Sequence, residues 1–254
     1  MFSLLLQVPE EQREMMIAEL WDAGAVGITE EEESLKAFFG PEADAWALMQ
    51  HFSSARPKVQ REEDRDWVQI AQNQWEPFEV GERFYLVPEW RDDPAPVGRL
   101  RLTMHPGMAC GSGTHPATRL CLMAIERHVK PGEHIIDVGT GAGILADAAR
   151  LLGAGPIVAC DIEHDASKVA RGNLDTSVSV FTGSARSIKS EAFDWAVCNL
   201  NAATLSALRA DLVRIATHLI LSGFTEDETD KVAGTFKRAV REQMELDGYG
   251  CLVL

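Results

Sequence analysis

A glycine-rich turn behind an aspartate is the stretch whose residue types and spacing most clearly suggest chemistry. Residues 134–149 read HIIDVGTGAGILADAA: an apolar run ends at Asp137, and glycines follow at every second position, Gly139, Gly141 and Gly143. Glycine lets the backbone turn sharply and approach a ligand with no Cβ in the way. A helix that starts after such a turn presents free N–H groups. The pattern therefore predicts a nucleotide-like ligand between a strand and a helix.

The spacing of the glycines narrows the choice of ligand. A dinucleotide-binding fingerprint has the spacing G-x-G-x-x-G, and a Walker loop needs Gly-Lys-Ser/Thr; this loop is G-x-G-x-G, and the chain has no Walker sequence. Asp161 ends the next apolar run, PIVACD, where a carboxylate can accept both hydroxyls of a ribose. NAD and the adenosine of S-adenosylmethionine both carry such a ribose, so these residues alone leave both open.

The combination of IIDVGTGAGILADAA with VACDIE resembles the class I S-adenosylmethionine-dependent methyltransferases, whose loop has the pattern acid-x-G-x-G-x-G. An acid such as Asp137 is compatible with a cationic amino-acid moiety and unfavourable beside a pyrophosphate. The resemblance implies S-adenosylmethionine as cofactor and S-adenosylhomocysteine as product. A dehydrogenase is the alternative class for this loop.

A second glycine-rich stretch lies upstream, HPGMACGSGTHPATRLCL at residues 105–122. Together with the cofactor loop it resembles the PrmA family, the methyltransferases of ribosomal protein L11, which carry P-G-M-A-F-G-T-G-x-H-x-T-T at this place. CNLNAATL, which contains Asn199, is similar to the family's A-N-I-x-x-x-x-L, and LILSGF to its L-x-x-S-G-I. The resemblance spans nearly the whole chain. It implies methyl transfer to amino groups, of lysine side chains or the N-terminus, of ribosomal protein L11.

The chain departs from the family pattern near the expected site. Ala71 and Gln72 stand where the family linker has a tryptophan and a lysine, CGSG replaces F-G-T-G, and Ala117 replaces one of two paired threonines. These changes bear on the substrate rather than on cofactor binding. Two alternatives therefore stand: a methyltransferase of another protein or a small molecule, and a cofactor-binding paralogue with weakened catalysis.

Asn199, at the carboxyl end of an expected strand, can offer a carbonyl oxygen to an amine; capping of the helix that starts at Ala202 is the alternative. Thr114 or Thr118 is a candidate cap for the helix after the upstream loop. His105 and His115 lack a metal-ligand partner set, so we expect them to form hydrogen bonds and expect no metal. The expected catalytic residues are Asn199 and Thr118, and the expected cofactor-binding residues are Asp137, Gly139, Thr140, Gly141, Gly143, Asp161, Gly111, Gly113, Thr114 and Asn199.

Hydrophobic periodicity predicts two domains joined by a linker region. Residues 1–60 read as β-α-β-β-α-β, the ferredoxin-like order, and the resemblance implies a substrate-recognition role for them. Residues 61–100 are expected to form a linker region with one short strand at RFYLVPEW. Residues 101–254 alternate strands and helices, which predicts a Rossmann-like, mostly parallel, doubly wound sheet with an antiparallel last strand.

The charge and cysteine pattern exclude several classes of partner and site. The formal net charge is −15, and the chain has no Lys/Arg cluster beyond Lys237–Arg238, so we expect a basic protein partner and no direct contact with nucleic acid; acidity for solubility alone is the alternative. The five scattered cysteines form no C-x-x-C pair, which is typical of a cytoplasmic protein without a disulfide framework. No apolar run reaches the roughly 18 residues of a membrane span, and the start MFSLLLQVPEEQ lacks the positive region of a signal peptide. We expect a monomer.

Overall fold

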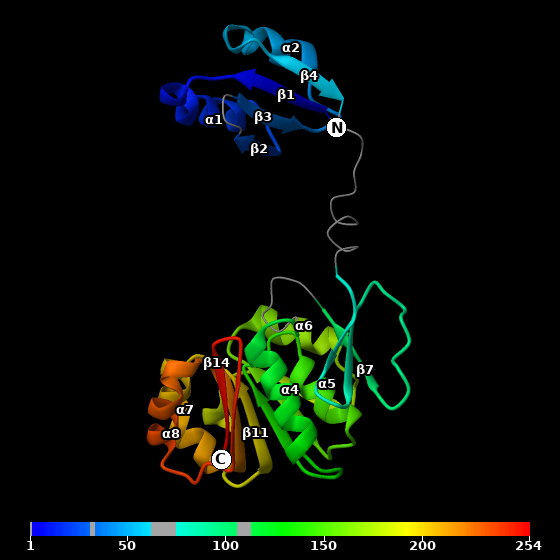
Figure 1. Ribbon diagram of the computed structural model, residues 1–254, viewed down its shortest axis with the longest axis vertical. Coiled ribbons are helices and arrows are strands. Elements are labelled where there is room, and N and C mark those ends of the chain that lie inside the picture. The colour runs from blue at the N-terminus through cyan, green and yellow to red at the C-terminus, as the bar shows by residue number, and fades with distance from the viewer. Residues whose placement is uncertain (1, 31–33, 62–74, 106–112) are drawn as a thin grey trace. The chain divides into compact units, whose positions relative to one another are not determined.

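The computed structural model describes residues 2–30, 34–61, 75–105 and 113–254. The chain divides into two compact units, Met1–Gln74 and Trp75–Leu254, and each is coloured by residue number in Figure 1. Ala71, Gln72 and Gly111 lie outside the described residues, so the expectations that concern them stay predictions. Within the described ranges, no helix combines the length and the apolar character that crossing a bilayer requires.

The smaller unit has the element order that the sequence predicts. Its elements are β1 (Phe2–Gln7), a 3₁₀ turn (Glu10–Gln12), α1 (Arg13–Asp22), β2 (Gly27–Glu30), β3 (Ser34–Phe39), α2 (Ala45–His51), a second 3₁₀ turn (Ser53–Ala55) and β4 (Lys58–Arg61). The strands lie in the order β2-β3-β1-β4, with every neighbouring pair antiparallel, which is the ferredoxin-like arrangement. Alternate residues of β1 and β3 are buried in its core, among them Leu4, Leu6, Leu35 and Phe39.

The α2 helix begins later than the predicted segment 41–52. Asp44 provides its N-terminal cap, because one carboxylate oxygen accepts hydrogen bonds from the backbone N–H groups of Trp46 at 2.9 Å and Ala47 at 3.1 Å. An aspartate in this position satisfies donors that the first helical turn leaves without partners. The helix start is therefore set by a side-chain cap and not by the proline at residue 41.

The larger unit begins with a small sheet where the sequence predicts a linker region. Its strands are β5 (Phe78–Val80), β6 (Phe84–Pro88) and β7 (Leu100–Met104), with β5–β6 antiparallel and β6–β7 parallel. The prediction of a connecting region with one strand is therefore wrong for residues 75–100. Phe84, Leu86, Leu102 and Met104 are fully buried and pack with the main core of this unit. Tertiary packing stabilises strands that are too short to show a clear periodicity.

The remaining elements form a doubly wound α/β layer structure (Figure 1). They are α4 (Pro116–His128), β8 (Ile135–Val138), α5 (Ile144–Leu151), β9 (Ile157–Asp161), α6 (His164–Asn173), β10 (Val178–Thr182), β11 (Phe193–Asn199), α7 (Ala202–Ile215), β12 (Ala216–Thr225), α8 (Thr229–Phe236), β13 (Glu242–Leu246) and β14 (Tyr249–Val253). In the described part of the chain, the sheet has seven strands in the order β10-β9-β8-β11-β12-β14-β13. Strands β8 to β12 are parallel, and β14 runs antiparallel to both neighbours. The predicted fold class is confirmed.

Two hydrophobic clusters cover the two faces of this sheet. Helices α4, α5 and α6 pack with one face, and α7 and α8 pack with the other. Successive residues of a strand point to opposite faces, so Trp195 and Val197 of β11 belong to the first cluster and Ala196 and Cys198 to the second. Because the strands are parallel, the carboxyl ends of β8, β9, β11 and β12 share one edge.

A carboxylate on α4 joins the small sheet to this layer. The Glu126 oxygens accept hydrogen bonds from the backbone N–H of Glu82 at 3.0 and 3.1 Å and of Arg83 at 2.9 Å. The turn between β5 and β6 passes close to this group, since a Cβ on Gly81 would lie 2.0 Å from a Glu126 oxygen. Glu126 therefore holds together segments more than 40 residues apart in the chain.

We expect Glu126→Ala to lower the free energy of unfolding of the larger unit by about 1–2 kcal/mol, because two backbone donors lose a charged acceptor. Urea unfolding followed by circular dichroism measures this. Glu82→Ala is the matched control, since only the backbone N–H of Glu82 takes part in the contact. Equal stability of the two variants would contradict the role of the Glu126 carboxylate.

Candidate functional site

The glycine loop lies between β8 and α5, at the carboxyl edge of the sheet. Gly139, Gly141 and Gly143 have φ angles of 77°, 55° and 96°, in the left-handed region that favours glycine. A Cβ would lie 2.6 Å from the Leu200 side chain at Gly139 and 2.9 Å from the Leu174 side chain at Gly143. All three glycines therefore serve the backbone conformation, and Gly139 and Gly143 also allow close packing.

Asp137, at the end of β8, is a carboxylate buried beneath this loop, with 1% of its surface exposed. The Thr140 hydroxyl donates to its Oδ2 at 2.7 Å, while Oδ1 has no hydrogen-bond partner among the described residues. Burial raises the pKa of Asp137 to about 6; the charge of Asp161 adds to this, and the Thr140 hydroxyl and the Ala146 N–H oppose it. The ionised form gains from any positive charge that a ligand brings to the loop.

Asp161, at the end of β9, holds the loop from the other side. Its Oδ2 accepts a hydrogen bond from the Gly141 N–H at 3.1 Å and its Oδ1 accepts one from the Glu163 N–H at 3.0 Å. A carboxylate oxygen has two lone pairs, so one acceptor position per oxygen remains for a diol. The next side chain, Ile162, is 75% exposed at the same edge. This exposed apolar side chain is not among the residues predicted from the sequence, although an isoleucine directly after the strand-end acid was the available signal.

Asn199 and Thr118, 81 residues apart in the chain, are hydrogen-bonded to each other. The Asn199 Nδ2 donates to the Thr118 Oγ1 at 2.9 Å, and the Asn199 Oδ1 accepts no hydrogen bond from the described residues. Asn199 lies on the same face of β11 as Val197, which is the face that α4 covers. The alternative role of Asn199 as a helix cap is wrong, because Asn201 caps α7 by accepting from the Thr204 N–H at 2.9 Å.

The first turn of α4 is capped by a histidine. His115 Nδ1 accepts a hydrogen bond from the Ala117 N–H at 3.2 Å, so the expectation of a Thr114 or Thr118 cap is wrong. Thr118 is instead 1% exposed and faces β11, while Thr114 is exposed. Ala117 is fully buried, so this departure from the family pattern falls within the core.

Gly113, two residues before the capping histidine, has φ 88°, and a Cβ there would lie 2.5 Å from Leu86 and 2.8 Å from Ile144. Gly113 thus allows the chain to pack against the small sheet and α5. His105 forms a hydrogen bond with Glu89 at 2.8 Å, which confirms the expected kind of role for both histidines. Among the described residues, no group of three His, Cys, Asp or Glu side chains is placed to hold a metal ion.

Leu200 connects the glycine loop with the strand that carries Asn199. Besides its contact with Gly139, its backbone N–H donates to the Ser222 carbonyl at 2.8 Å. β12 has an irregularity between Ser222 and Phe224, and Gly223 there has φ 97°. A Cβ on Gly223 would lie 2.6 Å from the Leu200 nitrogen. The Ser-Gly pair of the LILSGF motif therefore makes room for the chain that leaves β11.

The described cysteines near this site are not available as nucleophiles. Cys121, Cys160, Cys198 and Cys251 are buried and free. Burial raises the pKa of Cys160 to about 12 and also raises the pKa of Cys198, and the nearby charge of Asp137 acts in the same direction. Since the thiolate is the reactive form, the candidate chemistry rests on the polar groups around the loop.

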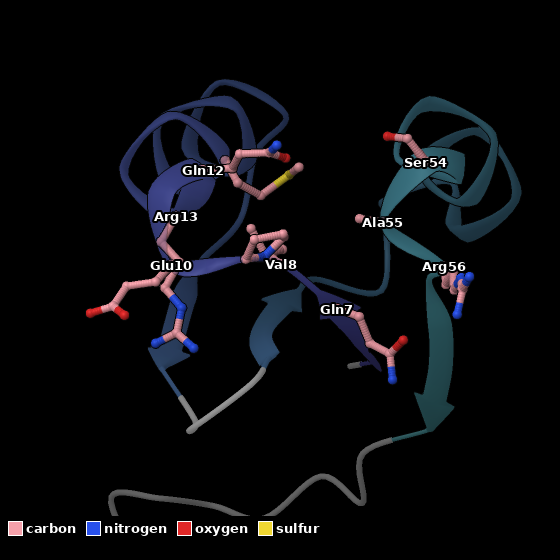
Figure 2. A pocket seen from close by; sticks show the side chains of 10 residues that line it. Gln7, Val8, Glu10, Gln12, Arg13, Ser54, Ala55 and Arg56 are labelled. Carbon is pink, nitrogen blue, oxygen red and sulfur yellow. The ribbon is translucent and has the colours of Figure 1, made fainter.

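A separate hollow of about 570 Å³ lies within the smaller unit (Figure 2). Val8 lies at its floor; the 3₁₀ turn before α1, with Glu10 and Gln12, forms one side, and Ser54 and Arg56 lie on the other. It shares no residue with the glycine-loop site, which belongs to the larger unit.

If the seven strands of the main sheet are numbered in chain order, with β8 as strand 1 and β14 as strand 7, they lie in the order 3-2-1-4-5-7-6. Strand 7 runs antiparallel to its neighbours. The doubly wound dinucleotide-binding fold has 3-2-1-4-5-6. The glycine loop follows strand 1 and an acid ends strand 2. These features define the class I methyltransferase fold.

The family assignment follows from a comparison of the whole chain. The family model described as ribosomal protein L11 methyltransferase (PrmA) matches residues 2–253. The chain belongs to this family.

Curated relatives and a solved structure agree with this assignment. A ribosomal protein L11 methyltransferase of Cupriavidus necator is 40% identical over 178 residues, and one of Burkholderia ambifaria is 38% identical over 200 residues. The matches cover 68% and 76% of this chain, and 59% and 66% of the relatives' own lengths. A crystal structure of a ribosomal protein L11 methylase from Lactobacillus delbrueckii subsp. bulgaricus superposes with a TM-score of 0.63 at 25% identity, covering 70% of this chain and 97% of that one.

The raised pKa of Asp137 predicts a pH-dependent stability. A raised folded-state pKa contributes stability that is present below the unfolded value near 4 and is lost as the pH rises through about 6. At pH 7.5 the ionised group costs about 3 kcal/mol relative to an unperturbed carboxylate. We therefore expect Asp137→Asn to raise the free energy of unfolding at pH 7.5 by up to about this amount.

Thermal unfolding between pH 4 and pH 8 checks this prediction, since the variant should also lose most of the pH dependence between pH 4 and pH 6. Asp92→Asn is the control, because Asp92 is exposed and a surface change of this kind alters stability by less than about 0.5 kcal/mol. A lower free energy of unfolding for Asp137→Asn than for the parent at pH 7.5 would contradict this prediction, because it would show that the folded protein stabilises the ionised carboxylate.

Proposed function

We propose that this protein transfers methyl groups from S-adenosylmethionine to amino groups of ribosomal protein L11. The observation that carries the proposal is the amide of Asn199, held by Thr118 at the sheet edge with its carbonyl oxygen free of described partners. The glycine loop lies beside it, linked through Leu200 and Gly139. A cofactor loop next to a neutral acceptor of hydrogen bonds suits transfer to an amine.

The residues around the loop fit S-adenosylmethionine. Asp161 would accept hydrogen bonds from both ribose hydroxyls, and Ile162 would lie against the purine. The negative charge of Asp137 would favour the positively charged methionine end and would repel a pyrophosphate. The left-handed glycines and Thr140 would bring the loop backbone near the ligand. Roles for Gly111, Gly113 and Thr114 in holding the methionine carboxylate stay predictions.

The reaction depends on a neutral amine. When bound, the cofactor supplies a methyl group on a positively charged sulfur; the amine nitrogen forms the new C–N bond as the C–S bond breaks, and a proton leaves to solvent. A free lysine, with a pKa of about 10.4, needs about 4.6 kcal/mol to be neutral at pH 7, and an α-amine of pKa about 7.8 needs about 1 kcal/mol. A neighbouring positive charge and limited water lower both pKa values.

Asn199 would orient the amine. Because its Nδ2 is bound to Thr118, its Oδ1 is the atom left to accept an N–H from the acceptor. Thr118, which is 1% exposed, would act as a positioning residue by fixing the orientation of this amide. Correct alignment of two reactants can contribute about 7–11 kcal/mol, so the site needs no strong base.

The charge of the chain supports a basic substrate. The net charge of −15 favours encounter with a basic protein, and the names of the relatives point to ribosomal protein L11. We assign substrate recognition to the ferredoxin-like unit. A monomeric state, a cytoplasmic location and the absence of nucleic-acid contacts stay predictions, as do the alternatives of another acceptor or of weakened catalysis.

We expect Asp161→Ala to weaken binding of S-adenosylhomocysteine at least about tenfold, because two hydrogen bonds to a charged acceptor are lost. Isothermal titration calorimetry measures the affinity. Asp165→Ala, an exposed acid in the first turn of α6, is the control and should bind as the parent does. Unchanged affinity in Asp161→Ala would mean that the ribose lies elsewhere.

We expect label from S-adenosylmethionine to enter ribosomal protein L11 when the purified protein is added. Asn199→Ala should lower kcat about 100-fold, because misplacement of a reacting group by about 1 Å has this effect. Asn201→Ala, two residues away, should keep kcat within about twofold and lose about 1 kcal/mol of stability as a helix cap.

The outcomes of this assay test the substrate, the cofactor and the role of Asn199 separately. No label in ribosomal protein L11, with S-adenosylhomocysteine still bound, would remove the assigned substrate and keep the cofactor. Equal losses of kcat in Asn199→Ala and Asn201→Ala would remove the role of Asn199.

A further inference from the structure

Four carboxylates line a hollow of about 470 Å³ between the chain that leaves β12 and the β13–β14 hairpin. The 3₁₀ turn after β12 contributes Glu226 and Asp227, the first turn of α8 contributes Asp230, and β13 contributes Glu245. All four side chains are exposed. Two segments about 15 residues apart in the chain thus place negative charge around one hollow, which we call the acidic hollow.

The acidic hollow lies at the edge of the sheet that carries Asn199, but on the other face. Ser222 of β12 is the register partner of Asn199, and Glu226 follows it by four residues. Glu245 points to the α8 face, since its neighbour Met244 belongs to the cluster on the α4 face. Asn199 lies on the α4 face. A group bound in the acidic hollow is therefore a different group from the amine at Asn199.

The described chain does not neutralise the charge of the acidic hollow. Its lining includes no Lys, Arg or His side chain, and none of the four carboxylates forms an ion pair with a described residue. Elsewhere in the same unit exposed acids do find such partners, as Asp211 does with Arg214 at 3.2 Å. Like charges around one hollow repel each other, and a positively charged ligand removes this repulsion.

A buried hydroxyl at the acidic hollow also lacks a partner. Thr229 is among the lining residues and is 2% exposed, and its Oγ1 forms no hydrogen bond with a described residue. The Oγ1 points from α8 toward the hairpin, because a Cβ on Gly250, the register partner of Glu245, would lie 2.5 Å from it. A buried polar atom without a partner destabilises the fold. A ligand that donates an N–H would satisfy it.

The arrangement favours an organic cation over a metal ion. Among the described residues, no three acidic, His or Cys side chains converge as metal ligands would. Carboxylates spread around a hollow of this size suit the separate N–H donors of guanidinium and ammonium groups, which form strong charge-assisted hydrogen bonds. A basic protein segment carries several such groups on one chain.

We infer that the acidic hollow is a docking site for an arginine- or lysine-containing segment of the protein substrate, bound apart from the amine that receives the methyl group. The inference rests on the proposed methyl transfer to a basic protein. The side chain that enters the hollow is not methylated. Its contact raises the affinity for the substrate and the rate of encounter, and it leaves the chemical step unchanged.

Kinetics with ribosomal protein L11 test the docking site. Asp227→Asn combined with Asp230→Asn, the hollow variant, should raise KM for this protein about tenfold, because two exposed charge contacts are lost. Its kcat should stay within about twofold of the parent. The control variant combines Asp92→Asn with Asp165→Asn; it removes two exposed negative charges outside the hollow and should keep KM within about twofold. The difference in KM between parent and hollow variant should decrease at high salt.

A binding measurement is independent of methyl transfer. Full-length protein is titrated with acetyl-triarginine amide at low salt by isothermal titration calorimetry, and the uncharged tricitrulline analogue serves as the control ligand. The hollow variant should bind triarginine about tenfold more weakly than the parent does. Thr229→Val keeps the side-chain shape; it should weaken binding about threefold and raise the melting temperature, because no buried hydroxyl then lacks a partner. Affinity for S-adenosylhomocysteine should change less than about twofold in every variant.

The outcomes separate this inference from the proposed function. Triarginine binding that the hollow variant loses, without methyl transfer to ribosomal protein L11, would support the docking site and overturn the proposed reaction. Methyl transfer with the same KM in parent and hollow variant would overturn the docking site. An equal rise of KM in the control variant would show an effect of net charge alone and would also overturn it.

Two further results bear on the ligand and on the variant. Saturable uptake of Mg²⁺ from MgCl₂ by the parent, lost in the hollow variant, would assign the acidic hollow to a metal ion and overturn the inference. If the hollow variant does not fold, Glu245→Gln takes its place in both measurements, with the same direction of change expected. Equal affinity for triarginine and tricitrulline in the parent would exclude recognition of positive charge.

Discussion

The candidate site depends on the hydrogen bond that joins Asn199 of β11 to Thr118 of α4. This contact brings the first turn of a helix to the edge where the sheet offers its strand ends. Gly113 allows the approach on one side, because its missing Cβ leaves room for Leu86 and Ile144. Without close packing at that point, the amide of Asn199 would have no fixed orientation.

Leu200 couples the two halves of the site. It lies against Gly139 of the glycine loop and against Gly223 of β12, and neither position has space for a Cβ. A shift of the loop therefore displaces the residue next to Asn199. Close-packed interiors transmit such shifts because few voids absorb them. The glycines of two separate motifs act as a single packing unit around one leucine.

Asp137 illustrates a conflict between stability and ligand binding. Burial beneath the loop raises its pKa to about 6, so near neutral pH the folded protein holds a costly charge. A positively charged group nearby stabilises the ionised carboxylate and so lowers this cost. Functional sites commonly contain such strained or poorly solvated groups, which are compensated by the rest of the fold. The surrounding buried strands and helices provide that compensation here.

Outside residues 75–104, the sequence by itself determined the order of strands and helices, together with the glycine loop and the acids at the ends of β8 and β9, because periodicity and turn chemistry are local properties of the chain. Only the tertiary structure decided that β5, β6 and β7 form a sheet, that His115 caps α4, and that Thr118 binds Asn199. These features depend on contacts between segments far apart in the chain, and such contacts form only when packing brings the segments together.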